Sequence, residues 1–586
     1  MTTEKNYWTR RSRMGRRGFM GATGAAGAGL AALALTGCGD DDDNSSTPKP
    51  SGSTPAAGSS ATAGASTATE QPKKGGVFNY PQTSTLTDVF DPHTSISQAG
   101  LFYTVIGNIA LRPSVDATKL DPELVEKWEV PGDGTEINLT IRQGVTWHNK
   151  PPTNGRAFTT DDLAFNLTRI TGKLNPDRLA SFQRASTLPN FESATAVDDK
   201  TVKVKLTKPH SSFLYGMSDW RNSIIPRDFV EKGGKFEDGA SLIGTSPWMI
   251  ESFQNPVKAV FRPNPNAWEK GMPYLDTLNW VFYGDVLSSQ AGFGKGEIDY
   301  VPGSEKVVND TIKKIAPTAR EESWAFGNWS HLRMNTTKQL SDPRIRLALF
   351  LALPFKNMND DNYGDKWDWT GPLSPGFPEG IPSAEIAKLP GYNPATKAAD
   401  IKSAKDSMAA AGFPDGKGLA FKIFYTPTSA SLQANAVSAQ DAWKSAFPQI
   451  SVELDPAADG AVFARRQAAG DFDIISYVVF PAADGVIDMS TNYHSTGSRN
   501  YGKFADPSID ALLEKASTQL DVKARTETMR SIQTQALTKF MPTIHIANPK
   551  QIAYFQPKVK GMTGYASPIG GGSYDTGRNI RKAWLA

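Results

Sequence analysis

Residues 122–149 read PELVEKWEVPGDGTEINLTIRQGVTWHN and determine the order of strand and turn in the first folded part of the chain. The Asp-Gly pair at 133–134 is typical of a turn. After it, Ile137, Leu139 and Ile141 alternate with polar residues, which is the pattern of a strand with one buried face. This stretch therefore predicts a tight turn followed by a β-strand whose side chains alternate between a buried and an exposed face.

Helix start signals follow at several places along the chain. Residues 159–170 read TTDDLAFNLTRI, and Thr159 with Asp162 has the spacing of a capping box, which predicts a helix that begins there. The Asp-Pro pairs at 342–343 and 506–507 each precede apolar residues at helical spacing. Both pairs predict a capped helix that packs on a core, so the chain is expected to mix helices and strands.

Taken in order, these blocks resemble the large extracytoplasmic solute-binding proteins of ABC importers, family 5, whose best-known members bind dipeptides, oligopeptides or nickel complexes. Matching blocks cover nearly the whole folded region. They include PELVEKWEVPGDGTEINLTIRQGVTWHN from 122, IGTSPWMIESF from 243, GKGEIDYV from 294, LRMNTTKQLSDPRIRLALFLAL from 332, GDFDIISYVVFP from 470 and RNYGKFADPSIDALLEKA from 499.

The resemblance implies an α/β fold of the two-lobed periplasmic-binding-protein type (class II), with an extra subdomain in the first lobe and a hinge between the lobes. The expected limits are 75–325 for lobe I with the inserted subdomain at about 110–215, 326–541 for lobe II, and 542–586 for a C-terminal return to lobe I. One hinge strand is expected from Trp324 to Asn335 and the return crossing near Pro542 to Asn548. A ligand that contacts both lobes would favour the closed state.

The N-terminal residues 1–37 have the pattern of an export signal. Arg16-Arg17-Gly18-Phe19-Met20 resembles a twin-arginine motif, and the eighteen residues from Met20 to Gly37 carry no charge. Leu35-Thr36-Gly37-Cys38 resembles the bacterial lipobox, so signal cleavage would leave Cys38 as the lipidated N-terminus. The alternative is a transmembrane helix, but the Gly/Ala content is poorly apolar and no stop-transfer pattern follows.

Residues 38–74 form a Ser/Thr/Ala/Gly/Pro tract without apolar periodicity, which predicts a disordered linker after the lipidated Cys38. The folded part would then stay outside the cell, anchored to the membrane by lipid. Family relatives are expected to be monomers.

Charge and composition exclude several classes of function. The net charge of +3 falls to about −2 without residues 1–37, which carry six basic residues and one acidic residue. No basic field for nucleic acid therefore remains. Cys38 is the only cysteine, so redox chemistry is not expected.

Motifs for catalysis or for a dedicated metal cage are missing from the sequence. There is no Gly-x-Ser-x-Gly elbow, no zincin motif and no phosphate-binding Gly-Lys-Ser/Thr loop, so no catalytic residue is assigned. Six scattered histidines without His-x-x-x-His or paired cysteines give no support to a metal site, and no cofactor is expected. His148 and His331 lie in blocks that resemble family scaffold, which favours buried histidines with satisfied hydrogen bonds.

Ligand contacts are harder to assign, because peptide-binding relatives use an acidic side chain for the peptide amine and this chain departs from them. Asp484 is the nearest acidic candidate, and the alternative is a turn residue before Gly485. The other candidates are residues that could line the cleft: Tyr80, Thr83, Trp324, Tyr477, His494, Arg499 and Asn500.

Together these observations predict a lipid-anchored receptor that passes a short peptide to an ABC permease. A non-peptide solute such as a sugar, an opine or a metal chelate is the first alternative. A sensor subunit is the second, and a secreted hydrolase is the least favoured.

Overall fold

The computed structural model describes residues 71–83, 89–94, 101–114, 119–182, 184–303, 305–324, 327–482, 484–562 and 577–586. The expected export signal, Cys38 and nearly all of the linker lie outside these residues. Among the helices that are described, none is long and apolar enough to cross a membrane.

The strands of the described residues form two four-stranded sheets, a three-stranded sheet, a six-stranded sheet and two small two-stranded sheets. In spatial order these are: β1 (Val77–Gln82), β10 (Thr277–Phe282), β9 (Lys258–Pro263) and β8 (Trp248–Gln254); β4 (Val125–Glu129), β5 (Glu136–Ile141), β7 (Thr201–Leu206) and β6 (Phe191–Ala196); β11 (Tyr300–Gly303), β19 (Gln551–Phe555) and β12 (Arg320–Trp324); β14 (Trp367–Asp368), β18 (Thr543–Pro549), β13 (Trp329–Met334), β17 (Ile474–Val479), β15 (Ala420–Tyr425) and β16 (Ser451–Pro456); β2 (Leu111–Pro113) and β3 (Leu120–Pro122); β20 (Val559–Lys560) and β21 (Trp584–Leu585).

Helices connect and cover these sheets. They are α1 (Phe102–Ile106), α2 (Thr160–Ile170), α3 (Phe213–Gly216), α4 (Arg227–Glu231), α5 (Val286–Gly294), α6 (Lys306–Ile315), α7 (Pro343–Ala352), α8 (Phe355–Tyr363), α9 (Ser383–Ile386), α10 (Lys397–Ala410), α11 (Ala430–Ala446), α12 (Gly460–Ala469), α13 (Gly485–Tyr493), α14 (Pro507–Thr518) and α15 (Val522–Gln535).

The local predictions are confirmed where the sequence signals were strongest. Thr159 caps α2 in a reciprocal capping box with Asp162. Asp342 caps α7, and Asp506 caps α14, each with proline at the start of the helix. The alternating run after the Asp-Gly turn is β5, whose three apolar side chains are buried.

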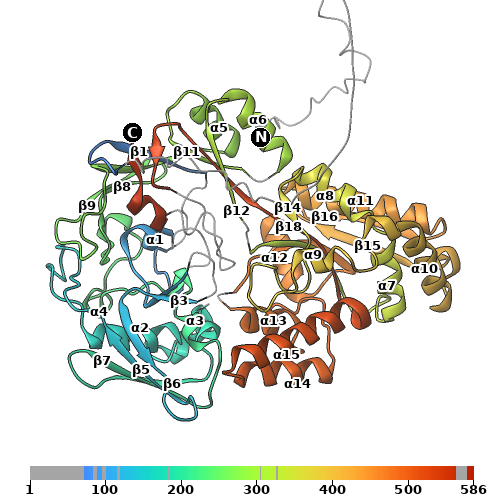
Figure 1. The fold of residues 1–586 in the computed structure, drawn as a ribbon, viewed down its shortest axis with the longest axis horizontal. Helices are drawn as coiled ribbons and strands as arrows, with labels where there is room; N and C mark the ends of the chain where they lie inside the picture. Colours follow the sequence, from blue (N-terminus) through green and yellow to red (C-terminus); the bar gives the residue numbers. More distant parts are fainter. Residues whose placement is uncertain are drawn as a thin grey trace, which may run out of the picture. The chain divides into compact units, whose positions relative to one another are not determined.

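A separate core underlies the sheet formed by β4, β5, β7 and β6. Helix α2 lies against this sheet, as Figure 1 shows, and the buried faces of β5 and β7 pack against Leu163 and Leu167 of the helix. The strand residues that contribute are Ile137, Leu139, Val202 and Val204. These residues lie within the range expected for the inserted subdomain.

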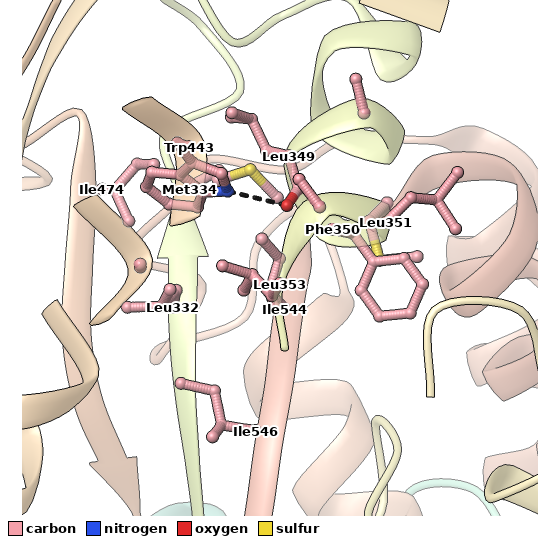
Figure 2. Packing of buried hydrophobic residues seen from close by; sticks show 14 of the residues in the cluster. Leu332, Met334, Leu349, Phe350, Leu351, Leu353, Trp443, Ile474, Ile544 and Ile546 are labelled. Carbon is pink, nitrogen blue, oxygen red and sulfur yellow. Dashed lines mark hydrogen bonds between the residues drawn. The ribbon is translucent and has the colours of Figure 1, made fainter. Parts of the chain in front are cut away.

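The six-stranded sheet has its apolar face against helices α7, α10 and α11. Leu332 and Met334 of β13, Ile474 of β17, and Ile544 and Ile546 of β18 belong to one buried cluster (Figure 2).

One hydrogen bond joins two of the covering helices within this cluster. The indole Nε1 of Trp443 in α11 donates to the carbonyl oxygen of Leu349 in α7 at 2.8 Å (Figure 2). That carbonyl belongs to the last turn of α7, where backbone oxygens lack partners within the helix. The bond therefore fixes α7 and α11 relative to each other on the sheet.

The chain passes between the three-stranded and six-stranded sheets twice, on neighbouring strands. It leaves β12 at Trp324 and enters β13 at Trp329, and it leaves β18 at Pro549 and enters β19 at Gln551. Because β12 pairs with β19 and β13 pairs with β18, both antiparallel, the two crossings lie side by side. On the return, the strand partner changes at residue 550, between β18 and β19. The lobe limits expected from the sequence stay predictions.

Candidate functional site

A polar and aromatic face covers the side of the six-stranded sheet that is opposite to its apolar core. Trp329 and His331 alternate on β13, so their side chains point to the same face. The ring of Trp329 lies 4.8 Å from that of His331 and 4.9 Å from that of His545 on β18. Tyr477 of β17 meets His331 edge-on at 5.5 Å. We call Trp329, His331, His545 and Tyr477 the ring cluster.

Several polar atoms of the ring cluster are buried without a hydrogen-bond partner among the described residues. They are Nε1 of Trp329, both ring nitrogens of His331, and Nδ1 of His545. Buried polar groups in native proteins nearly always have a partner, which can be protein, water or a ligand. These atoms therefore have hydrogen-bonding capacity left over for a water molecule or a ligand.

The two histidines are neutral. Burial lowers the pKa of His331 and of His545 well below the ordinary value, and the nearby charge of Arg333 lowers both further. A neutral imidazole has one donor and one acceptor. The hydroxyl of Tyr493 lies 2.9 Å from Nε2 of His545, which leaves Nδ1 for another partner. The ring cluster can thus bind an uncharged polar group, such as an amide, through paired donors and acceptors.

His331 corrects a prediction, whereas His148 confirms one. Both were expected to be buried with satisfied nitrogens. Nε2 of His148 lies 3.0 Å from the carbonyl oxygen of Ser246, and its Nδ1 accepts from the backbone N–H of Gly244 at 3.2 Å. His331 is equally buried, but neither of its ring nitrogens meets the criteria of a hydrogen bond to any described residue.

Asp484 lies at the start of α13, where its Oδ1 caps the helix. It accepts from the backbone N–H of Val486 at 2.8 Å and of Ile487 at 3.3 Å. The hydroxyl of Ser212 also donates a short hydrogen bond to this oxygen. In this geometry Asp484 has a structural role before Gly485, as the second interpretation of the sequence expected. Its role as a ligand contact stays a prediction.

The hydrogen bond from Ser212 is part of a larger contact between the expected inserted subdomain and the expected second lobe. The backbone N–H of Ser211 donates to the carbonyl oxygen of Ser517 at 2.8 Å. Its hydroxyl donates to the carbonyl oxygen of Ala516 at 3.2 Å. We call these bonds, together with the bond from Ser212 to Asp484, the serine contact. It joins residues some 300 positions apart in the sequence.

The remaining predicted ligand residues fall into two groups. Tyr80 is buried and stacks on Tyr300 at 5.1 Å, and Trp324 packs against the same apolar cluster. Thr83 follows directly on β1 and is half-buried.

The second group lies in the turn between α13 and α14. Nε2 of His494 is 3.9 Å from Asp510 and 3.8 Å from Glu514. Asn500 bonds to the backbone of Phe504 within that turn. Nη1 of Arg499 donates to the carbonyl oxygen of Phe480 at 2.6 Å. Of the predicted residues, only Tyr477 belongs to the ring cluster.

Asp488 is a residue that the sequence interpretation missed. It is fully buried one helical turn after Asp484, and its Oδ1 accepts from the backbone N–H of Ala482 at 2.9 Å. Its Oδ2 has no partner in the described part of the chain. The sequence analysis predicted no helix here, so the spacing of four residues that puts Asp484 and Asp488 one turn apart on α13 was not recognised as a signal.

Charged groups around Asp488 act on it in both directions. Burial raises its pKa to about 6, the charges of Arg499 and Arg333 oppose this rise, and Asp484 adds to it. Among the described residues, no group of three or more acidic, histidine or cysteine side chains is placed to bind a metal ion.

Asp488→Asn is expected to stabilise the protein at neutral pH. The folded carboxyl binds a proton below about pH 6, whereas the unfolded one does so only below about pH 3.9. Between these values the native state holds more protons, so the free energy of unfolding falls as pH rises through this window. The gain for the variant is about 3 kcal/mol above pH 6 and absent near pH 4. Urea unfolding at a series of pH values measures it.

The matched control is Asp361→Asn, because Asp361 is exposed on α8. This substitution is expected to leave the pH dependence of unfolding unchanged. Identical unfolding curves for Asp488→Asn and the parent protein at pH 7.5 would contradict the burial argument.

Comparison with known proteins identifies the family. The family model described as bacterial extracellular solute-binding proteins, family 5 Middle, matches residues 119–500. The periplasmic murein peptide-binding protein MppA of Escherichia coli is 23% identical over 426 residues, which are 69% of this chain and 75% of that protein. Heme-binding protein A of Haemophilus influenzae is 25% identical over 478 residues, 78% of this chain and 83% of that protein.

Solved structures agree with the fold. DppA of Helicobacter pylori in complex with the peptide STSA has a TM-score of 0.70 at 20% identity and covers 88% of this chain and 98% of its own. AppA of Bacillus subtilis in complex with a nonapeptide has a TM-score of 0.68 at 19% identity and covers 88% and 100%. The two-lobed periplasmic-binding-protein fold expected from the sequence is confirmed. Because the family model spans most of the folded region, this chain belongs to the bacterial extracellular solute-binding proteins, family 5.

Proposed function

We propose that this protein is a lipid-anchored receptor that captures a short peptide between two lobes and delivers it to the permease of an ABC importer. Family membership supports solute binding, and the names of similar proteins favour peptides. Besides MppA, the di/tripeptide-binding protein 1 of Pseudomonas aeruginosa is 24% identical over 479 residues. Family and structural relatives are solute-binding proteins and not enzymes.

The observation that carries the peptide proposal is the ring cluster beside the chain crossings. Each peptide unit offers one N–H donor and one carbonyl acceptor. The neutral His331 offers one donor and one acceptor in return, and Trp329 adds a donor. Neutral partners suit peptide amides, because no charge has to be balanced when the site closes. Among the predicted ligand residues, Tyr477 fits this arrangement best because it touches His331.

Closure is the second part of the proposal. The paired crossings at 324–329 and 549–551 can act as the hinge, and the serine contact lies away from them in the sequence. A ligand held by both lobes would add its binding energy to the closed state, in which the serine contact forms. The permease would then recognise the closed form.

The anchoring part of the proposal rests on the sequence. Arg16-Arg17 would direct export, Cys38 would receive the lipid, and the 38–74 linker would tether the folded part outside the cell. A lipid chain contributes about 0.8 kcal/mol per buried methylene, so several chains hold a protein on a membrane without a span.

A metal chelate is the second candidate ligand, since one relative is named a heme-binding protein. Two neutral imidazoles with unpartnered nitrogens, on His331 and His545, would supply nitrogen ligands for the metal of such a chelate. This candidate predicts a coloured protein, which peptide binding does not.

The identity of the ligand can be tested by native mass spectrometry of the protein as purified. We expect co-purifying masses that differ by amino-acid residues, because closed clefts of this kind retain their ligand. One discrete mass with visible absorbance would replace peptides by a chelate. Conversion of an added peptide to products would instead indicate a hydrolase.

Ser212→Ala is expected to favour the open state. A hydrogen bond to a charged group contributes about 1.5–3 kcal/mol, so the ratio of the closed to the open state should fall roughly tenfold or more. Fluorescence energy transfer between a label in 75–325 and one in 326–541, measured without ligand, reports this change. Ser218→Ala is the control, because the hydroxyl of Ser218 bonds within the range expected for lobe I, to the carbonyl oxygen of Tyr215 at 2.6 Å. If the distance between the two labels is the same in Ser212→Ala as in Ser218→Ala, the serine contact does not stabilise the closed state.

Cys38→Ala is expected to release the exported protein from the membrane. The substitution removes the thiol that would carry the lipid, while the folded part keeps its sequence. Fractionation of cells fed with labelled fatty acid measures both lipid incorporation and location. A variant that still sediments with membranes would show that another segment holds the protein there.

A further inference from the structure

A basic pocket lies in a part of the molecule that the proposed function does not use. Its walls come from β2, from the segments around Glu123 and Glu269, and from the C-terminal residues 578–582. Figure 1 shows the C-terminal segment, in red, beside α1, where Arg581 donates to the carbonyl oxygen of Gly107 at 2.5 Å. The pocket has a volume of about 40 Å³ and adjoins a hollow of about 560 Å³.

Positive charge predominates in the lining. The basic residues of the pocket and the hollow are Arg112, Arg142, Lys270, Arg578, Arg581 and Lys582, whereas the acidic ones are Glu123 and Glu269. Nη1 of Arg581 pairs with Glu269 at 2.9 Å. Most of the excess positive charge therefore has no partner among the carboxylates of the walls.

Four polar atoms buried in this pocket have no hydrogen-bond partner among the described residues. They are Nε and Nη2 of Arg578, Nε of Arg581, and Oε2 of Glu123. Glu123 and Arg581 are each about 95% buried. Donors and an acceptor thus face the same small space, which indicates a molecule that accepts from guanidinium groups and donates to a carboxylate.

Glu123 is an anion in this setting. Burial by itself would raise its pKa, but the charges of Arg578 and Arg581, with the hydrogen bond from Asn108, outweigh burial and lower the pKa. Its Oε1 accepts from Asn108 at 2.7 Å, so Oε2 is the oxygen left to accept. Among the described residues, neither Nε and Nη2 of Arg578 nor Oε2 of Glu123 has a hydrogen-bond partner, although both side chains line the same pocket and attract each other.

A water molecule could bridge this space, but it would leave the excess positive charge in place. Sulfate would balance the charge, but it has no O–H for Glu123 at neutral pH. A phosphate monoester loses its O–H near pH 6. Inorganic phosphate near neutral pH carries negatively charged oxygens, which can accept hydrogen bonds, and at least one O–H, which can donate one. The pocket has room for about three water-sized groups, which suits a compact ion.

We propose that this pocket binds inorganic hydrogen phosphate, whose oxygens accept from Arg578 and Arg581 while its O–H donates to Oε2 of Glu123. The site is separate from the ring cluster and does not depend on which solute the receptor carries.

The test is isothermal titration calorimetry of the purified protein at pH 7.5 with sodium phosphate and, separately, sodium sulfate at equal ionic strength. We expect phosphate to bind at least tenfold more tightly than sulfate, because only phosphate can donate to Glu123. Arg578→Gln should weaken phosphate binding roughly tenfold or more. Glu123→Gln should bring the two ions to about equal affinity, because the amide can donate to sulfate.

Arg227→Gln is the matched control, since Arg227 is exposed on α4 and pairs with Glu231. It should bind phosphate like the parent protein. If Glu123→Gln fails to fold, Arg578→Gln still tests the site, because Nε and Nη2 of Arg578 have no hydrogen-bond partner among the described residues. Absence of phosphate binding, equal affinity for sulfate in the parent protein, or unchanged binding in Arg578→Gln would each overturn the site. Peptide binding by the same samples is unaffected in every case.

Discussion

The chain crosses between the three-stranded and the six-stranded sheet twice, and backbone pairing holds the two crossing segments together. Strand β12 pairs with β19 on one side, and β13 pairs with β18 on the other. Backbone hydrogen bonds fix Trp324 opposite Gln551 and Ser330 opposite Ala547. Strands held in this way cannot slide, because a slip of one residue would turn every side chain to the other face. If the two lobes move as proposed, the bending or twisting takes place where the pairing changes from one sheet to the other, between β12 and β13 and at residue 550.

Ion pairs lie close to the same crossings. Lys366 pairs with Glu321 of β12 at 3.1 Å, and Lys550 pairs with Asp368 of β14 at 3.7 Å. All four side chains are partly exposed, so each pair contributes little to stability. They join the two sheets without fixing them rigidly, which agrees with a hinge.

The ring cluster follows from this geometry, because β13 and β18 are the strands that leave the crossings. Side chains that alternate on β13 place apolar Leu332 and Met334 against the helices and leave Trp329 and His331 for the opposite face. Burial next to Arg333 keeps the histidines neutral. The outcome is a buried cluster of neutral rings with several unpartnered hydrogen-bonding atoms among the described residues, next to one buried guanidinium group.

Local elements and family membership could be predicted from the order of residues in the chain. Caps such as Thr159 with Asp162, or Asp342 before Pro343, act over three or four residues, so their spacing in the chain is their spacing in space. Tertiary structure alone decided the site. The contact of Ser212 with Asp484 spans 272 residues, and the burial of His331 and Asp488 depends on elements brought together from distant parts of the chain. Periodicity shows which face of an element is buried, but not against which element it packs, and for that physical reason the ring cluster and the basic pocket could not be read from the sequence.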